Sequence, residues 1–180
     1  MNKIQAYIDA YINHYMILEE KELDFFRKSK SLEESIINAT KAIDFNGKRL
    51  SHQRRLKIQV LETMAKKLLN RKQDFINSTC FDEIYAIVNE ERIFGFGKLA
   101  IYDTSLRISA YQNIEPDSVY LHAGTKKGAK NIGVNTFGKK QLKLNDLPLE
   151  FQKAINNNSI GYKHIEDILC IFKDRLKQKN

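Results

Sequence analysis

Apolar residues recur every three or four positions along most of the chain, which is the spacing of one buried face of an α-helix. From the N-terminus, Ile4, Tyr7, Ile8, Tyr11, Tyr15 and Leu18 predict one long amphipathic helix over residues 3–28. Only two prolines and eight glycines occur in 180 residues, and a β-sandwich of many short strands needs more turn residues than that. We therefore expect an all-α protein of about eight helices, folded as a single domain over residues 1–180.

Local signals divide the rest of the chain into further helices. Ser31-Leu32-Glu33-Glu34 is typical of a capping box and predicts a helix that continues through Ile43. Ser51 and Thr79 are the predicted caps of two later helices, and Asp44-Phe45-Asn46-Gly47 is a turn signal. The other expected elements are a helix carrying the apolar residues from Leu56 to Leu68, helices at 81–90, 98–111, 149–156 and 163–177, one turn or helix within 117–133, and a loop or short hairpin at 134–146.

The sequence carries no sign of a membrane or secreted protein. No apolar run approaches the roughly 18 residues that a bilayer span needs. The N-terminus, Met1-Asn2-Lys3, leads to Asp9 without an apolar signal core. Cys80 and Cys170 lie 90 positions apart in a chain without a secretion signal, so we expect free thiols, a cytoplasmic location and no membrane partner.

The net charge of +8 is concentrated in two basic segments. Residues 47–72 carry nine Lys and Arg against one Glu, and residues 118–145 carry six Lys and no acid. The intervening residues 73–117 have a net charge of −5. A basic face is the electrostatic feature expected of a protein that binds the phosphate backbone of nucleic acid. Solvated lysines on exposed helix faces, which need no partner, are the alternative interpretation.

The most informative local pattern joins two apolar helices through two glycines. Ile93-Phe94-Gly95-Phe96-Gly97-Lys98 lies between the predicted helices 81–90 and 98–111. Glycines two positions apart are typical of a tight turn that enters a helix, and we expect Phe94 and Phe96 to anchor this turn in the core. N–H groups at a helix start bind anions, and Lys98 adds a positive charge there. An ordinary corner between two core helices is the alternative.

This pattern of apolar-x-Gly-apolar-Gly before an apolar helix resembles the helix-hairpin-helix motif, here about residues 81–111. The motif holds DNA backbone phosphates with the amides of its hairpin and does not read sequence. The likeness extends to helix-hairpin-helix DNA glycosylases, in which a Val-Asp-Thr-His segment with the catalytic Asp follows. Here Val119-Tyr120-Leu121-His122 follows, so the resemblance covers roughly residues 81–133. It implies a glycosylase-like all-helical fold and double-stranded DNA as the partner.

The sequence departs from the glycosylases at the residues that carry their chemistry. Tyr120 stands at the position of the catalytic Asp, and Leu99 stands where bifunctional members have a nucleophilic Lys. A shifted alignment makes Asp117 the candidate carboxylate. Asp103 is a second candidate because an acid among apolar residues can have a perturbed pKa, and its spacing to Arg107 predicts a helical ion pair. The resemblance implies a DNA N-glycosylase that hydrolyses the bond to a flipped base, or a relative that has lost this activity.

Two further groups are candidates for contact with DNA phosphates. The stretch from His122 to Lys130 combines two glycines, Thr125 as a predicted helix cap, and three lysines, with a solvated helix as the alternative. Arg54 and Arg55 belong to a basic, irregular stretch. The predicted DNA-binding set is therefore Gly95, Phe96, Gly97, Lys98, His122, Thr125, Lys126, Lys127, Lys130, Arg54 and Arg55. The histidines are dispersed and neither a CxxC pair nor a GxxxxGK[ST] loop occurs, so we expect no zinc site and no cofactor.

The leading hypothesis is thus an intracellular DNA-binding protein related to helix-hairpin-helix glycosylases. The rival is a protein-interaction module of the antitoxin or immunity type, in which the acidic N-terminal helix or a basic segment docks on a charged protein partner. An RNA-binding accessory protein is a third hypothesis, distinguished by a preference for RNA over duplex DNA.

Overall fold

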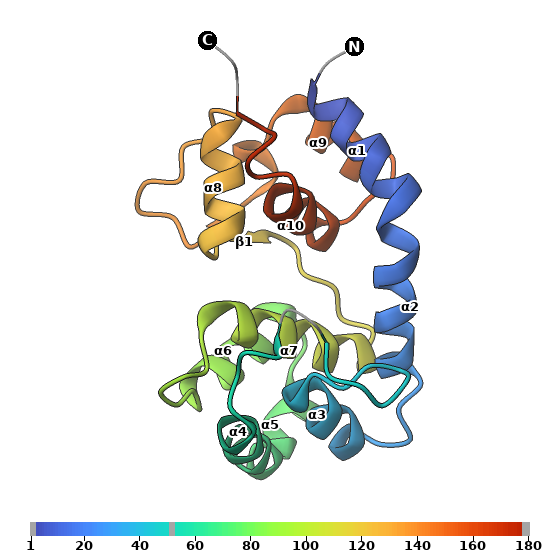
Figure 1. Cartoon of the computed structure of the whole chain (residues 1–180), viewed down its shortest axis with the longest axis vertical. Coiled ribbons are helices and arrows are strands. Elements are labelled where there is room, and N and C mark those ends of the chain that lie inside the picture. The colour runs from blue at the N-terminus through green and yellow to red at the C-terminus, as the bar shows by residue number, and fades with distance from the viewer. Residues whose placement is uncertain (1–2, 51–52, 178–180) are drawn as a thin grey trace. The chain divides into compact units, whose positions relative to one another are not determined.

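The computed structural model describes residues 3–50 and 53–177, and these residues are mostly helical (Figure 1). They form ten α-helices and one small antiparallel sheet, in which Val119 pairs with Leu142 and Tyr120 with Gln141. The helices are α1 (Lys3–His14), α2 (Met16–Arg27), α3 (Leu32–Lys41), α4 (Ile58–Asn70), α5 (Lys72–Asn77), α6 (Phe81–Glu90), α7 (Lys98–Tyr111), α8 (Ala123–Asn131), α9 (Leu149–Asn156) and α10 (Tyr162–Ile171). The strands are β1 (Val119–Tyr120) and β2 (Gln141–Leu142), followed by a 3-10 turn, η2 (Leu144–Asp146). The mostly helical class is therefore confirmed.

The contacts of the chain divide it into two compact units. Met1–Leu18 and Pro116–Asn180 form one unit, called here the terminal unit, and Glu19–Glu115 form the other, called the middle unit. Each has its own cluster of buried apolar side chains. The expected single domain stays a prediction. No helix in the described residues is long and apolar enough to cross a membrane.

The division explains why the predicted helix over residues 3–28 is two helices that meet at Tyr15. Ile8 and Tyr11 of α1 are buried in the core of the terminal unit, whereas Leu23 and Phe26 of α2 are buried in the core of the middle unit. The apolar residues of α1 and α2 therefore contribute to two separate cores. The periodicity of the sequence detects the helices but does not mark the break.

The predicted helix caps at Ser31, Ser51 and Thr79 have different outcomes. Ser31 is confirmed, because its side chain accepts the N–H of Glu34 at 3.2 Å. Thr79 is not the cap of α6, which begins after Cys80; instead the Thr79 N–H donates to Glu83 at 2.6 Å. Ser51 lies outside the described residues, and α4 begins later than expected, after Lys57. Arg49 donates to the carbonyl groups of Gln53 and Leu56 at 2.8 Å, which ties Arg49 to the residues just before α4.

Helix α7 is the central element of the middle unit. It packs against α3 and α6, and both of its long sides carry buried residues, among them Ile101, Thr104 and Ile108. A helix that is buried around most of its circumference is typical of the centre of a core. The other helices of this unit are thereby placed relative to α7.

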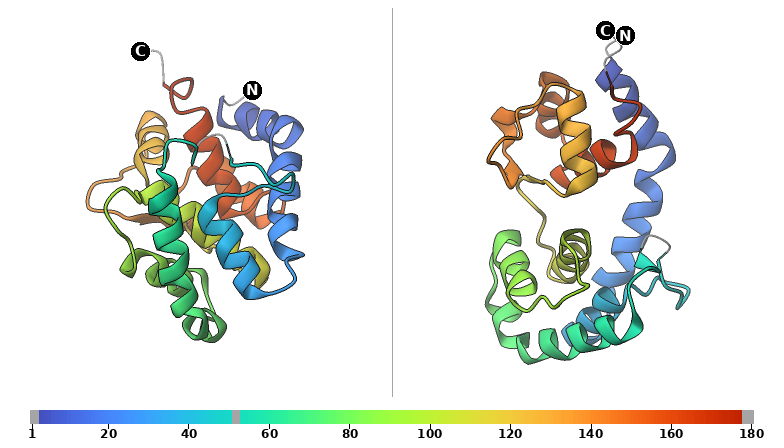
Figure 2. Two further views of the ribbon diagram at one scale, coloured as in Figure 1. Left: turned by 60° about the horizontal axis from the view of Figure 1, so that its bottom comes forward. Right: turned by 60° about the vertical axis from the view of Figure 1, so that its left-hand side comes forward.

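Helix α8 packs closely on α10 in the terminal unit, and the two lie side by side in Figures 1 and 2. The contact requires glycine at position 128. A Cβ atom built there would lie 2.0 Å from the carbonyl oxygen of Leu169, which is far inside van der Waals contact. The side chain of Cys170 approaches the backbone at Gly124 in the same way, at 2.6 Å from such a Cβ position. Small residues on one face of α8 therefore set its distance from α10.

We expect Gly128→Ala to destabilise the protein by about 1–3 kcal/mol, because α8 and α10 must separate to admit the methyl group. Urea unfolding followed by circular dichroism measures this free energy. The sign of the change in the free energy of unfolding separates the two cases, because Gly→Ala within an unconstrained helix stabilises a protein by about 0.5–1 kcal/mol. Lys127→Ala on the exposed side of α8 is the control and should change stability by no more than about 0.5 kcal/mol. A more stable Gly128→Ala variant would contradict the close packing.

Candidate functional site

The turn between α6 and α7 is built on one glycine in a left-handed conformation. The Phe96 N–H donates to the Ile93 carbonyl at 3.0 Å, which closes a β-turn with Gly95 at its third position. Gly95 has φ +92°, a value that a type II turn requires and that residues with a Cβ rarely adopt. Phe96 is buried as expected, but Phe94 is fully exposed. The prediction that Phe94 anchors the turn is wrong, because the second position of this turn points outward.

The turn leads directly into the start of α7, where the backbone is open. Gly97 is the N-cap residue, and its carbonyl accepts the N–H of Ile101 at 3.0 Å. Having no side chain, Gly97 cannot cap the second or third residue of the helix, and helix geometry leaves the N–H groups of Lys98 and Leu99 without intrahelical acceptors. Apart from its neighbours along the chain, no atom of the described residues lies within 4 Å of a Cβ position at Gly97. Exposed amides with the helix dipole behind them favour an anion at this point.

The first turn of α4 lies beside the same glycine turn. A Cβ position at Gly95 is 3.4 Å from the side chain of Val60 in that first turn. Lys57, the N-cap residue of α4, makes no side-chain cap and is exposed, as are Arg54 and Arg55 just before it. Two helix starts and a set of basic side chains therefore belong to one region of the middle unit.

The basic segment 47–72 divides into paired and unpaired charges. Lys67 lies 2.7 Å from Glu91, Arg71 pairs with Glu90 and Glu91, and Lys72 pairs with Glu33. Lys67 and then Arg71 lower the pKa of Glu91, so this network stays ionised well below neutral pH. In the described part of the chain, Arg54, Arg55, Lys57 and Lys98 have no carboxylate partner. The charges near the glycine turn are therefore available for an external anion, as are those of Lys48 and Lys66 elsewhere in the segment.

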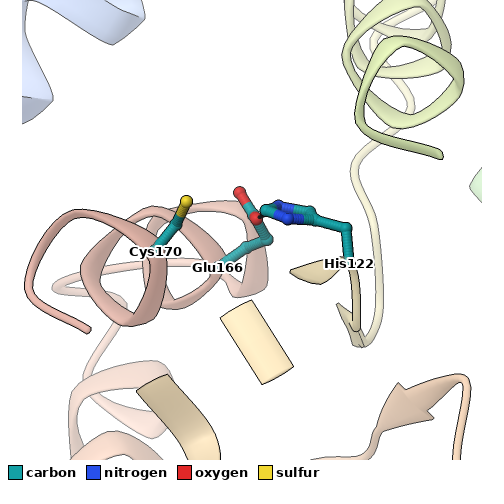
Figure 3. Close-up of side chains that lie close together, drawn as sticks. All are labelled: His122, Glu166 and Cys170. Atoms are coloured by element: carbon teal, nitrogen blue, oxygen red, sulfur yellow. Dashed lines mark hydrogen bonds and ion pairs between the residues drawn. The ribbon is translucent and has the colours of Figure 1, made fainter. Parts of the chain in front are cut away.

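The terminal unit holds a buried polar cluster that joins the start of α8 to α10 (Figure 3). His122 is the N-cap residue of α8, so the predicted cap, Thr125, lies inside the helix. The Thr125 hydroxyl donates to Glu166 at 2.5 Å and lies 2.8 Å from Nε2 of His122, which also hydrogen-bonds to Glu166. All three side chains are buried. Their mutual hydrogen bonds hold α8 in register on α10, and the phosphate contact expected of His122 and Thr125 stays a prediction.

Cys170 completes a group that could ligate a metal ion. The donor atoms of His122, Glu166 and Cys170 lie within 4.8 Å of one another, and Figure 3 shows the Glu166 carboxylate against the His122 ring with the Cys170 side chain beside it. Imidazole, carboxylate and thiolate donors suit Zn²⁺. Sequence reasoning missed this group because 44 residues separate His122 from Glu166. The only local signal was the i, i+4 spacing of Glu166 and Cys170 on one helix face.

The two predicted catalytic aspartates lie in different units. Asp117 is exposed in the terminal unit and pairs with Lys143 at 3.1 Å. Asp103 lies in α7 of the middle unit, where its carboxylate accepts a hydrogen bond from Gln53 at 2.6 Å. Arg107 forms an ion pair with Glu22 on α2, at 3.1 Å. The predicted ion pair between Asp103 and Arg107 stays a prediction. Tyr120, at the position of the glycosylase Asp, is buried in β1.

No known family model matches this chain, and no curated protein or solved structure shows significant similarity to it.

We expect Thr125→Val to destabilise the protein by about 1–3 kcal/mol, because the buried Glu166 carboxylate loses a donor while the side-chain volume is kept. Thr104→Val is the matched control. Thr104 is also fully buried, but its hydroxyl has no hydrogen-bond partner in the described structure. Its replacement should be neutral or stabilising in the same urea titration. Equal losses in the two variants would contradict the bridging role of Thr125.

Proposed function

We propose that this protein binds double-stranded DNA by its backbone phosphates, with the start of α7 as the primary contact. The observation that carries the proposal is the uncapped helix start at Gly97, held outward by the Gly95 turn and accompanied by unpaired basic side chains. Amides presented in this way neutralise a phosphate oxygen by hydrogen bonds and by the helix dipole. Lys98 lies within the first turn, and Lys57 lies at the neighbouring helix start.

This arrangement supports the resemblance to helix-hairpin-helix proteins and, over residues 81–133, to the helix-hairpin-helix DNA glycosylases. An apolar-x-Gly-apolar-Gly turn that buries its two apolar positions and exposes the middle one matches the pattern on which the resemblance rests. Ile93 packs on the core and Phe96 is buried within it. Contacts to phosphates carry no sequence information, so we expect little preference among duplex sequences.

The proposal is of a binding protein rather than an active glycosylase. A buried phenol at Tyr120 cannot supply the carboxylate that such an enzyme needs. Asp117 and Asp103 are engaged by Lys143 and Gln53 respectively. Basic side chains and open amides suffice for phosphate binding and require neither residue.

Salt dependence of duplex binding tests the proposal. We expect the logarithm of the association constant to fall steeply with the logarithm of salt concentration, because each neutralised phosphate releases counterions. Lys98→Gln and Lys57→Gln should each reduce the magnitude of this slope by about 1. Lys66→Gln is the control, since Lys66 is equally exposed on α4 but lies more than two turns from its start. Fluorescence anisotropy with a random-sequence duplex gives all four slopes.

A variant at Gly97 separates the amide contact from general charge. Gly97 has φ −80° and open space around its Cβ position, so Gly97→Val folds without strain in the free protein. The added side chain covers the amides and should weaken duplex binding about tenfold or more, equivalent to losing one charge-assisted hydrogen bond. Duplex affinity unchanged in a folded Gly97→Val protein would overturn the proposal. Absence of salt-dependent binding, with a stoichiometric protein co-purifying, would favour the protein-interaction hypothesis.

A further inference from the structure

The outer face of α8 in the terminal unit carries a second group of lysines. Gly124, Thr125 and Gly128 face α10, so Lys126, Lys127 and Lys130 lie on other sides of the helix. Lys126 and Lys130 are four residues apart and therefore project from one face. The loop that follows α8, drawn in orange in Figure 1, runs beside this face. Helix and loop together enclose a hollow of about 370 Å³ lined by Lys126, Lys130 and residues 134–138.

Charge pairing distinguishes the lysines of this hollow from their neighbours. Lys127 pairs with Asp174 at 2.5 Å, Lys139 with Asp146 at 2.5 Å, and Lys143 with Asp117 at 3.1 Å. Lys126 and Lys130 have no carboxylate partner in the described residues. The two lysines that line the hollow are thus without a counter-charge, as is Lys140, which does not line it. An anion in the hollow would meet both ammonium groups.

A buried hydroxyl in the same hollow also lacks a partner. Thr136 is 2% exposed, and its Oγ1 atom makes no hydrogen bond within the described structure. Buried polar atoms are nearly always hydrogen-bonded, and this unpartnered one belongs to a residue that lines the hollow. A phosphate oxygen satisfies it as the acceptor of the Thr136 O–H.

An aromatic side chain stands at the mouth of the hollow. Phe137 is 92% exposed, and its backbone N–H donates to the side chain of Asn135 at 2.9 Å, which orders the tip of the loop. An exposed phenylalanine on an ordered loop offers a flat apolar surface that a ligand can cover. A nucleic-acid base provides such a surface, and stacking on aromatic side chains is how single strands are commonly held.

We propose that this hollow binds one phosphate of single-stranded DNA and stacks the adjoining base on Phe137. Lys126, Lys130 and the Thr136 hydroxyl hold the phosphate. The strand must be single because both faces of a paired base are covered by its neighbours in a duplex. An acidic peptide would meet the lysines but offers nothing that stacks on Phe137. The inference rests on the proposed function only in taking DNA as the polymer, since duplex contact at α7 involves other residues in the other unit.

The test is anisotropy of the full-length protein with a fluorescein-labelled oligothymidylate of about eight nucleotides at low salt. We expect Lys126→Gln with Lys130→Gln to weaken binding about tenfold or more, and Phe137→Ala to weaken it about fivefold or more. Thr136→Val should weaken it while keeping the protein folded, because its hydroxyl has no partner to lose. Lys127→Gln is the matched charge control and should change the affinity less than about twofold.

The outcomes separate this inference from the proposed function. The variants at Lys126, Lys130, Thr136 and Phe137 should leave duplex affinity unchanged. Gly97→Val should leave oligothymidylate affinity unchanged. Duplex binding without oligothymidylate binding overturns this inference and leaves the proposed function standing. Oligothymidylate binding without duplex binding supports this inference and overturns the proposed function. Equal effects of Lys127→Gln and the double lysine variant, no effect of Phe137→Ala, or displacement by a short polyglutamate peptide each overturn the inference.

Discussion

The β-turn at Gly95 is the constraint on which the middle unit depends. Its left-handed backbone brings the chain out of α6 and sets where α7 begins, and α7 is the helix against which α3 and α6 pack. The same turn buries Phe96, exposes Phe94 and leaves the first amides of α7 open. One backbone conformation therefore determines both the core of this unit and the surface to which we assign phosphate binding.

Some charged side chains of this protein form ion pairs within the fold, and others remain available for binding. Arg71, Lys67 and Lys72 are held by acids of neighbouring helices, and Arg107 is held by Glu22. The exposed pairs among these add little stability each, but they fix the positions of the charged side chains, whereas Arg107 is buried. In the terminal unit, one face of α8 packs closely on α10 through its glycines and the Thr125–Glu166 hydrogen bond. The opposite face is then free to present lysines.

The helices that the sequence predicts correctly are those whose buried apolar residues all face one core. The helices at 81–90, 98–111 and 149–156 match exactly, and Ser31 caps α3 as its motif predicts. Periodicity cannot show that α1 and α2 belong to different cores, nor that the second position of a glycine turn exposes Phe94. The Thr125–Glu166 contact joins segments that only the tertiary fold brings together, and the hollow at Thr136 depends on the path of the loop after α8. Local patterns therefore indicated the glycine turn but neither the buried polar cluster nor the Phe137 loop.

Amide chemical shifts of the ¹⁵N-labelled protein during titration with a DNA duplex test the central claim most directly. The account predicts that the largest changes occur at the N–H groups of Gly97, Lys98 and Leu99, because those amides meet the phosphate. Smaller changes should extend to Lys57 at the start of α4. Saturable duplex binding that leaves these amides unmoved, with the changes elsewhere in the chain, would contradict it.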